Sequence, residues 1–366
     1  MTPSKELRFF DPHFHLWDMT PEKEEEGEDS STTTVSGHDN SSFPPNFPNL
    51  YGKAEYEAEI IGGGGGGGVS NYNDNVQVVH EGGVCIEVNS INFVDQSGEE
   101  LISMYQKELN WTLKQFQTKG SSSSNKQNQD QDEDDGDCKL YMYQACASLE
   151  ASNVKEWLEI LSKIPTQVCG IRQIINYKPS WPRNDNLGEL LNNDDWKRGY
   201  RLLGEYNLTF DMQLNPNQFE SALELIKDTP NVYVIINHLG TPTIEDLTDE
   251  KRKQIYWDGI EEFSQCKHVI GIKISMLSRI DPKNWDTNPI VIEAIHRIIK
   301  LFGVQRVAFA SNAPVDANNN DDDDMSLSWP ASRVLAAFDK ITASTYTTLE
   351  RAWLFADAAK RMYHCS

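Results

Sequence analysis

Two histidines near the start of the chain have the spacing of a metal-binding pair. His13 and His15 stand two residues apart within the short apolar stretch 9–18. Because side chains alternate along an extended strand, both imidazoles and Asp11 are expected on one face and Phe14 on the other. Neutral imidazole is the commonest protein ligand of a divalent cation. An arbitrary pair of this kind is more often structural, so its interpretation depends on the rest of the chain.

Short apolar runs alternate with amphipathic helical patterns along most of the chain. Eight strands are predicted to lie near residues 9, 84, 140, 168, 208, 232, 269 and 306. Strands that alternate with helices favour a parallel sheet, and eight such units are the number that closes a barrel. We therefore predict an α/β fold, a (β/α)8 TIM barrel formed as a single domain over residues 1–366. A doubly wound open sheet is the alternative.

Three low-complexity stretches are predicted to be disordered insertions in the loops of this barrel, at about residues 19–75, 117–137 and 317–326. The first contains an unbroken glycine run, and each contains a run of acidic residues that contributes to the formal net charge of −23. An acidic chain with no basic cluster argues against nucleic acid as a partner, because phosphate neutralisation by Lys and Arg dominates that affinity. A small-molecule substrate is expected instead.

The six cysteines are scattered, with no C-x-x-C pair, which indicates free thiols in a reducing compartment. The sequence has no run of about 18 apolar residues and no apolar leader at its start, so neither a membrane partner nor secretion is expected. A cytoplasmic location is the prediction. Whether the protein forms a homo-oligomer is left open.

Catalytic groups of such a barrel lie at the C-terminal ends of its strands. Polar residues stand at most of the predicted strand ends: His13, His15, Glu87, Arg172, Asp211, Gln213, Asn237, His238, Lys273, Ser275, Ser311 and Asn312. A chance pair of histidines would not be accompanied by polar residues around the barrel. We therefore expect these side chains to meet in one cup.

Taken together, the strand-end motifs resemble the amidohydrolase-related (amidohydrolase-2) branch of the metal-dependent hydrolases. The motifs are residues 11–18 (DPHFHLWD), 170–173 (GIRQ), 209–213 (TFDMQ), 237–242 (NHLGTP), 273–275 (KIS) and 311–316 (SNAPVD). Within that branch the chain is most similar to the predicted lactonase group, whose characterised relatives open lactones of sugar acids and of aromatic-degradation intermediates. The resemblance covers residues 9–18 and 84–365 apart from the inserts.

This resemblance implies roles for individual residues. Three histidines match metal ligands, namely His13, His15 and His238, and the last of these either binds metal or polarises the substrate carbonyl. Arg172 would hold a carboxylate or the developing oxyanion through its planar fork of donors. Four more residues are expected to face the substrate: Gln213, Lys273, Ser275 and Asn312. The implied cofactor is a divalent metal, zinc or manganese, although some lactonase relatives work without one. Structural alternatives are a pairing of Arg172 with Asp211 and a strand-capping role for Lys273.

One departure from the family pattern concerns the general base. Metal-dependent members have an Asp at the end of strand 8, where this chain has Asn312, and an amide cannot accept a proton. We assign the base to Asp316, four residues later, with Asp18 as the other carboxylate near the mouth and Asp11 behind these two. Opening of a lactone by water attack on its carbonyl is the expected reaction. Decarboxylation or another reaction of the superfamily is the alternative, and a catalytically altered barrel is the third interpretation.

Overall fold

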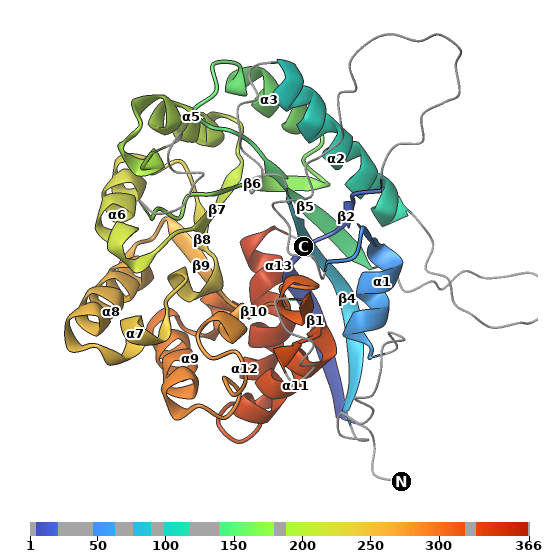
Figure 1. Cartoon of the computed structure of the whole chain (residues 1–366), viewed down its shortest axis with the longest axis vertical. Helices are drawn as coiled ribbons and strands as arrows, with labels where there is room; N and C mark the ends of the chain where they lie inside the picture. Colours follow the sequence, from blue (N-terminus) through green and yellow to red (C-terminus); the bar gives the residue numbers. More distant parts are fainter. Residues whose placement is uncertain are drawn as a thin grey trace, which may run out of the picture.

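Eight parallel strands form the centre of the molecule. The computed structural model describes residues 5–20, 47–62, 76–88, 99–117, 139–178, 188–318 and 327–364. Its main sheet consists of β1 (Lys5–Phe14), β4 (Val76–Ile86), β5 (Leu140–Cys146), β6 (Val168–Ile174), β7 (Thr209–Gln213), β8 (Val234–Ile236), β9 (Val269–Ile274) and β10 (Val307–Phe309), in that spatial order. The strands curl into a barrel with helices around it (Figure 1). The predicted strands and the TIM barrel are confirmed.

Amphipathic helices cover the outside of the barrel. They are α2 (Glu99–Gln117), α3 (Val154–Leu161), α5 (Asp194–Glu205), α6 (Phe219–Asp228), α8 (Glu250–Gln265), α9 (Pro289–Phe302) and α11 (Ala331–Thr342). In α9, Asn288 caps the first turn by accepting a hydrogen bond from the Ile290 N–H (3.0 Å), and Pro289 takes the first position, where no N–H is needed. Its buried residues recur every three or four positions and face the sheet. No helix among the described residues is long and apolar enough to cross a membrane.

The first and last strands are joined by residues that follow their ends. The Asn312 N–H donates to the His13 carbonyl (2.8 Å), and the His15 N–H donates to the Ala313 carbonyl (2.8 Å). The Asp11 carboxylate adds a clasp, because it accepts hydrogen bonds from the backbone N–H (3.1 Å) and the hydroxyl of Ser311, 300 residues away in sequence. We call these contacts the seam. They close the barrel beside the predicted site.

Strand β1 departs from the strict alternation predicted for it. Its register with β4 shifts between Phe9 and Asp11, and again between Asp11 and Phe14. Such irregularities insert a residue and redirect the side chains that follow. Asp11 therefore contacts the hydroxyl of Tyr56 (3.0 Å) and the seam instead of joining the histidines in the cup. The prediction of one common face for Asp11, His13 and His15 is wrong for Asp11.

Part of the first predicted insert belongs to the fold. Residues 47–62 contain the short strand β3 (Leu50–Tyr51), which pairs with β2 (Trp17–Asp18), and helix α1 (Lys53–Ile60). Tyr56 of α1 is fully buried and stacks on Phe14, with ring centroids 3.9 Å apart. The composition of residues 19–75 hides this element, since one aromatic side chain anchors a short polar helix. Most of the three predicted inserts otherwise lies outside the described residues.

The last helical segment forms the floor of the barrel. After α12 (Thr348–Ala352) the chain passes through a π-helical turn (Trp353–Asp357) into α13 (Ala358–Met362), which lies within the ring of strands in Figure 1. Met362 and Tyr363 join a buried cluster with the inward-facing side chains Phe10, Val84, Met142, Ile235 and Ala308. Gly271 of β9 makes room for this segment, because a β-carbon there would overlap the Met362 side chain.

Candidate functional site

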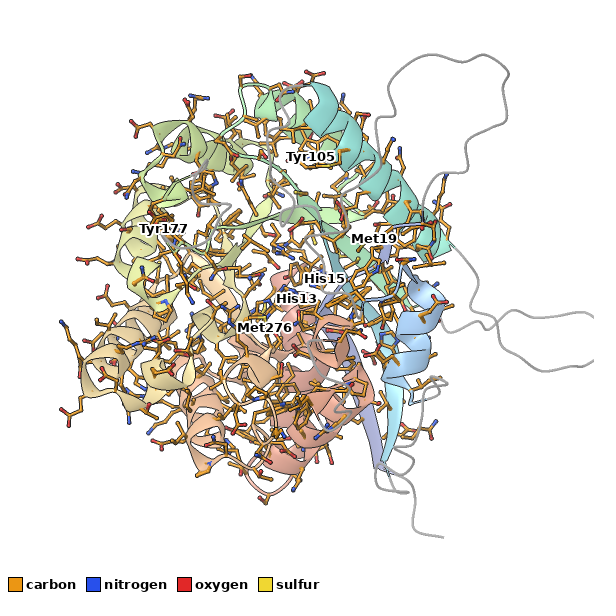
Figure 2. All side chains as sticks on the ribbon, viewed as in Figure 1. His13, His15, Met19, Tyr105, Tyr177 and Met276 are labelled. Atoms are coloured by element: carbon orange, nitrogen blue, oxygen red, sulfur yellow. The ribbon has the colours of Figure 1, made fainter. Side chains whose placement is uncertain are left out.

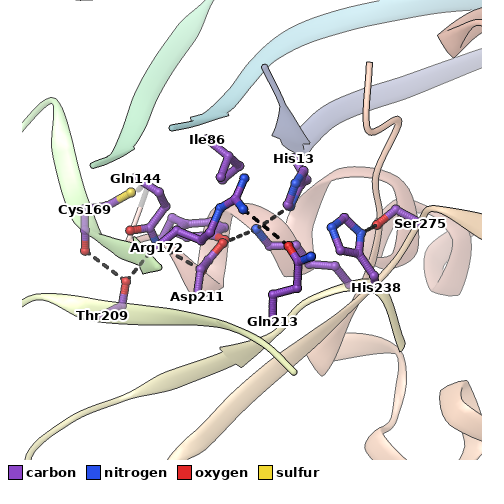
Figure 3. A network of polar contacts seen from close by, with 12 residues as sticks. His13, Ile86, Gln144, Cys169, Arg172, Thr209, Asp211, Gln213, His238 and Ser275 are labelled. Atoms are coloured by element: carbon purple, nitrogen blue, oxygen red, sulfur yellow. Dashed lines mark hydrogen bonds and ion pairs between the residues drawn. The ribbon is translucent and has the colours of Figure 1, made fainter. Parts of the chain in front are cut away.

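All nine residues predicted for the site lie at or just after the C-terminal ends of strands, and each is at most 8% exposed. They are His13 on β1 and His15 after it, Arg172 on β6, Gln213 on β7, His238 after β8, Lys273 on β9 and Ser275 after it, and Asn312 and Asp316 after β10. His13 and His15 lie near the middle of the molecule in Figure 2, and Figure 3 shows the polar network around His13 and Arg172. We call this region the cup.

The three histidines cluster tightly. The His13 ring centroid lies 4.4 Å from that of His238 and 5.0 Å from that of His15. Nδ1 of His15 lies 3.0 Å from the Ile86 carbonyl, which can only accept, so this nitrogen carries the proton. Burial lowers the pKa of all three imidazoles, that of His15 to about 3. All three are therefore neutral near pH 7.

Two buried ion pairs surround the histidines. Nε of Arg172 lies 2.7 Å from Oε1 of Glu87, and the guanidinium also donates to the Glu87 backbone carbonyl (3.0 Å) and to Oε1 of Gln213 (3.4 Å). Lys273 pairs with Asp211. Arg172 therefore pairs with Glu87, and the alternative of a pair between Arg172 and Asp211 is wrong. Each cation has its own carboxylate, which offsets the cost of burying the charges.

Asp211 collects donors from three elements. Its carboxylate accepts hydrogen bonds from Nε2 of Gln144 on β5 (3.0 Å) and from the hydroxyl of Tyr363 (2.9 and 3.0 Å to its two oxygens), besides Lys273. Nζ of Lys273 also lies 3.4 Å from Nδ1 of His13. Gln144 is absent from the residues predicted for the site, although it is a polar residue near the end of a strand, as they are. Tyr363 lies on no strand, so nothing in the sequence indicates its contact with Asp211.

Asp316 differs from the ion-paired carboxylates. It is 3% exposed, and its Oδ1 accepts hydrogen bonds from Nδ2 of Asn312 (3.1 Å) and from the hydroxyl of Ser278 (3.1 Å). Burial raises its pKa to about 7, against the smaller lowering effect of these two neutral donors. The group can therefore take up and release a proton near neutral pH.

The loops that carry the cup have strained backbones. His238 and Asn312 have φ angles of 53° and 56°, and Met276, after β9, has a φ of 56°. Residues other than glycine rarely adopt this left-handed backbone conformation. Nδ1 of His238 lies 2.8 Å from the Ser275 hydroxyl, which fixes the ring. Conformations of this kind cluster at functional sites, where the surrounding structure holds them in place.

A cavity of about 280 Å³ opens near His238. Its lining includes Lys178, Asn215, Thr241, Thr243, Arg252 and Arg279. The Arg279 guanidinium contributes to the lowered pKa of His238, so its charge reaches the cup. Arg252 is paired with Asp246 (2.8 Å), whereas no described carboxylate forms an ion pair with Arg279. Arg279 therefore supplies positive charge to the cavity, whose lining includes none of the nine cup residues.

The expected zinc or manganese site does not fit the side chains present. Among the described residues, no group of three or more His, Cys, Asp or Glu side chains could hold a metal ion. Nε2 of His13 is buried without a hydrogen-bond partner, as a ligand nitrogen could be, but Lys273 stands beside Nδ1 of the same ring. An ammonium has no lone pair, so this contact favours Nδ1 as the acceptor and the ring proton on Nε2. A protonated Nε2 cannot bind a cation.

Sequence comparison connects the chain to a known family. The family model described as amidohydrolase matches residues 166–365. The uncharacterized protein y4mH of Sinorhizobium fredii is 31% identical over 196 residues, which make up 53% of this chain and 60% of that protein. The match therefore spans about three fifths of the length of this curated relative.

Solved structures share the fold. An amidohydrolase from Burkholderia multivorans with bound zinc has a TM-score of 0.63 at 13% identity, covering 97% of this chain and 99% of that one. A putative 2-pyrone-4,6-dicarboxylic acid hydrolase from Pseudomonas putida has a TM-score of 0.60 at 12% identity, covering 98% of each chain. A 2,6-dihydroxybenzoate decarboxylase from Rhizobium has a TM-score of 0.56 at 9% identity, covering 99% of each. With its family model matched over more than half its length, this barrel belongs to the amidohydrolase family.

Proposed function

We propose that the protein is a hydrolase that opens a lactone, a cyclic carboxylic ester, by attack of water on the carbonyl carbon. The proposal rests on one observation, the raised pKa of the buried carboxyl group of Asp316. A general base works best when its pKa lies close to the working pH, and burial gives Asp316 a pKa of about 7. Asn312 donates its amide to this carboxylate and so orients the base.

The cup also supplies groups that stabilise the transition state. Attack of water places negative charge on the carbonyl oxygen, and we assign its stabilisation to Arg172 and His238. Arg172 is held by Glu87, and His238 by Ser275, so neither needs to reorganise during the reaction. A preorganised donor of this kind typically contributes about 3 to 4 kcal/mol. Gln213, Lys273 and Asn312 are the remaining polar groups assigned to substrate binding.

The cavity near His238 suggests the type of lactone. Arg279 and Lys178 line it, and a guanidinium binds a carboxylate through two parallel hydrogen bonds. The Pseudomonas putida relative is named for the hydrolysis of a pyrone dicarboxylic acid, a lactone that carries carboxylates. We infer that the substrate of this protein is a lactone with at least one carboxylate, which would lie in the cavity while the ester carbonyl lies in the cup.

The test is an acid-release assay with a pH indicator, run on sugar-acid and aromatic-pathway lactones with and without a carboxylate. Each reaction is repeated with a chelator and with added zinc or manganese. We expect acid release from carboxylate-bearing lactones at a rate that the chelator leaves unchanged, because the described residues do not form a metal site.

Other outcomes would contradict this proposal. Release of carbon dioxide from aromatic acids would identify a decarboxylase, the activity named for the Rhizobium relative. Folded protein that releases neither acid nor carbon dioxide would indicate a catalytically altered barrel. Circular dichroism of each sample establishes that the protein is folded.

A further inference from the structure

The floor of the barrel reaches the cup through one side chain. Tyr363 is 1% exposed and approaches from the side opposite the strand ends, with its hydroxyl donating to the carboxylate of Asp211. Asp211 holds Lys273, and Lys273 contacts His13. A continuous chain of hydrogen bonds therefore runs from Tyr363 to a histidine of the cup. No other contact described above joins the terminal helical segment to the histidines.

The direction of these hydrogen bonds follows from the groups involved. Tyr363, Gln144 and Lys273 all donate to the carboxylate of Asp211, which accepts through both of its oxygens. Burial lowers the pKa of Lys273, but the ion pair with Asp211 opposes this effect and holds the group as an ammonium, with three hydrogens and no lone pair. Nδ1 of His13, 3.4 Å away, must accept. A neutral imidazole has one N–H, so the proton of His13 lies on Nε2.

We propose that Tyr363 is a positioning residue which, through Asp211 and Lys273, holds His13 as an Nε2–H donor that points at an oxygen atom of the substrate. Nε2 is buried and has no hydrogen-bond partner in the described part of the chain. A buried donor without a partner costs stability, unless a ligand satisfies it. The fitting ligand atom is a carbonyl or carboxylate oxygen. The donation to an ester carbonyl rests on the proposed function, whereas the tautomer does not.

The same contact works against a metal ion in the cup. A cation bound to Nε2 of His13 requires the ring proton on Nδ1, where it would face the ammonium of Lys273, donor against donor. Removing that ammonium would release the ring to bind a cation. The chain of hydrogen bonds thus favours His13 as a hydrogen-bond donor to an oxygen atom over His13 as a metal ligand.

A purely structural role for Tyr363 is the competing explanation. Its ring packs in the floor cluster with Met362, and Nζ of Lys273 lies 5.2 Å from the ring centroid. The substitution Tyr363→Phe keeps the ring and that cation–π contact and removes only the hydroxyl. Tyr105→Phe is the matched control, since Tyr105 is a buried tyrosine whose hydroxyl lies 2.8 Å from that of Ser148, and Figure 2 shows it in the outer layer.

The first experiment is nuclear magnetic resonance of the full chain labelled with ¹⁵N-histidine, without substrate. The His13 signals are assigned by their loss in His13→Gln. We expect a protonated Nε2 and an unprotonated Nδ1 in the unsubstituted protein and in Tyr105→Phe, and partly averaged shifts in Tyr363→Phe. A proton on Nδ1 in the unsubstituted protein would overturn the tautomer, and this measurement needs no variant to fold. Unchanged shifts in Tyr363→Phe would leave Tyr363 with a structural role only.

The second experiment is a zinc titration by calorimetry. The double variant Asp211→Asn with Lys273→Met removes both charges together and leaves neither buried alone. We expect it to bind zinc at least about tenfold more tightly than the unsubstituted protein, the size of effect typical of groups that orient a metal ligand. Equal affinity would contradict the exclusion of the metal. Neither experiment uses a substrate, so failure of the lactone assay and failure of this inference are distinguishable.

Discussion

Buried carboxyl groups in and around the cup have very different neighbours. Glu87 and Asp211 each pair with a cation, and Asp11 joins the two ends of the barrel at the seam. Among the described residues, the donors to Asp316 are neutral: the Asn312 amide, the Ser278 hydroxyl and, with a smaller effect, the Met276 backbone. Because a cation favours the charged form of a carboxyl group and burial opposes it, Asp316 combines a place in the cup with a proton that exchanges near pH 7.

Substituting this group tests its role as the base. We expect Asp316→Asn to lower kcat/KM by about 10² to 10⁴-fold, since an amide cannot accept the proton of the attacking water. In the unsubstituted enzyme kcat/KM should rise with pH through about 7, as Asp316 loses its proton, and then level off. Initial rates from pH 5.5 to 8.5 measure both effects. Asp339→Asn, which changes a carboxyl paired with Arg351, is the control for loss of a buried carboxylate. A pH-independent kcat/KM would rule out Asp316.

Arg279 permits a test of substrate class. We expect Arg279→Met to raise KM for carboxylate-bearing lactones by about 10 to 100-fold, the size of a lost charge-assisted hydrogen bond, with little change for uncharged lactones. Arg279→Lys should recover part of the loss, because it keeps the charge without the planar fork. Equal effects on charged and uncharged lactones would contradict a carboxylate site in the cavity.

At the scale of elements, two parts of the chain determine the shape of the cup. Parallel strands bring their C-terminal ends to one rim, and the terminal helix α13 fills the opposite end of the barrel. Close packing of this floor depends on Gly271, where any side chain would meet Met362. The floor is thus matched to β9, the strand that also carries Lys273.

Substitution of Gly271 tests how closely the floor packs against β9. We expect Gly271→Ala to lower the free energy of unfolding by about 1 to 3 kcal/mol through overpacking. Adding Met362→Ala should recover part of that loss, because the added methyl then occupies space that the methionine leaves. A double-mutant cycle of urea unfolding measures the coupling. Additive effects of the two substitutions would show that the added methyl group is accommodated without a clash with Met362.

The sequence predicts the elements better than the contacts between them. Apolar periodicity identifies all eight strands, because each buried strand needs its own apolar run. The polar strand ends point to eight of the nine residues assigned to the site, and Asp316 is assigned only because Asn312 cannot act as the base. The irregular register of β1 is invisible in the pattern, and it removes Asp11 from the cup. Helix α1 and the partner of Asp211 also depend on tertiary contacts, those of Tyr56 and Tyr363, which no local pattern encodes. The roles assigned to the site residues stay predictions.

For the whole molecule, buried groups determine how stability changes with pH. Burial lowers the pKa of five histidines, namely His13, His15 (to about 3), His80 (to about 4), His238 and His296. Their stabilising effect is present above the ordinary pKa of 6.5 and is lost as the pH falls below it. Asp11 and Asp316 have pKa values raised to about 6 and about 7. Their stabilising effect is present below the ordinary value of 3.8 and is lost as the pH rises through 6 and 7.

Large shifts belong to four of these histidines and to two carboxyl groups, so the effect of the histidines prevails below pH 6. The smaller shifts of other carboxyl groups oppose one another, being upward for Glu59, Glu150 and Glu189 and downward for Glu57, Glu81 and Asp281. We expect the melting temperature to rise from pH 4.5 to about 6.5, reach a maximum there, and change little or decline slightly up to pH 8. Calorimetry in buffers of matched ionic strength measures the curve. The melting temperature of Asp316→Asn, relative to that of the unsubstituted protein, should be higher at pH 8 than at pH 5. A stability maximum below pH 5 would show that the histidines are protonated in the folded state.

The seam has a consequence for the order of events during unfolding. Its backbone hydrogen bonds belong to His13, His15, Asn312 and Ala313, so the residues that close the barrel include three residues of the cup. Parting of the first and last strands, even for a moment and with the rest of the sheet intact, therefore dismantles the site. Loss of activity and hydrogen exchange at the amides of His15 and Asn312 should then follow the same rate constant, ahead of global unfolding.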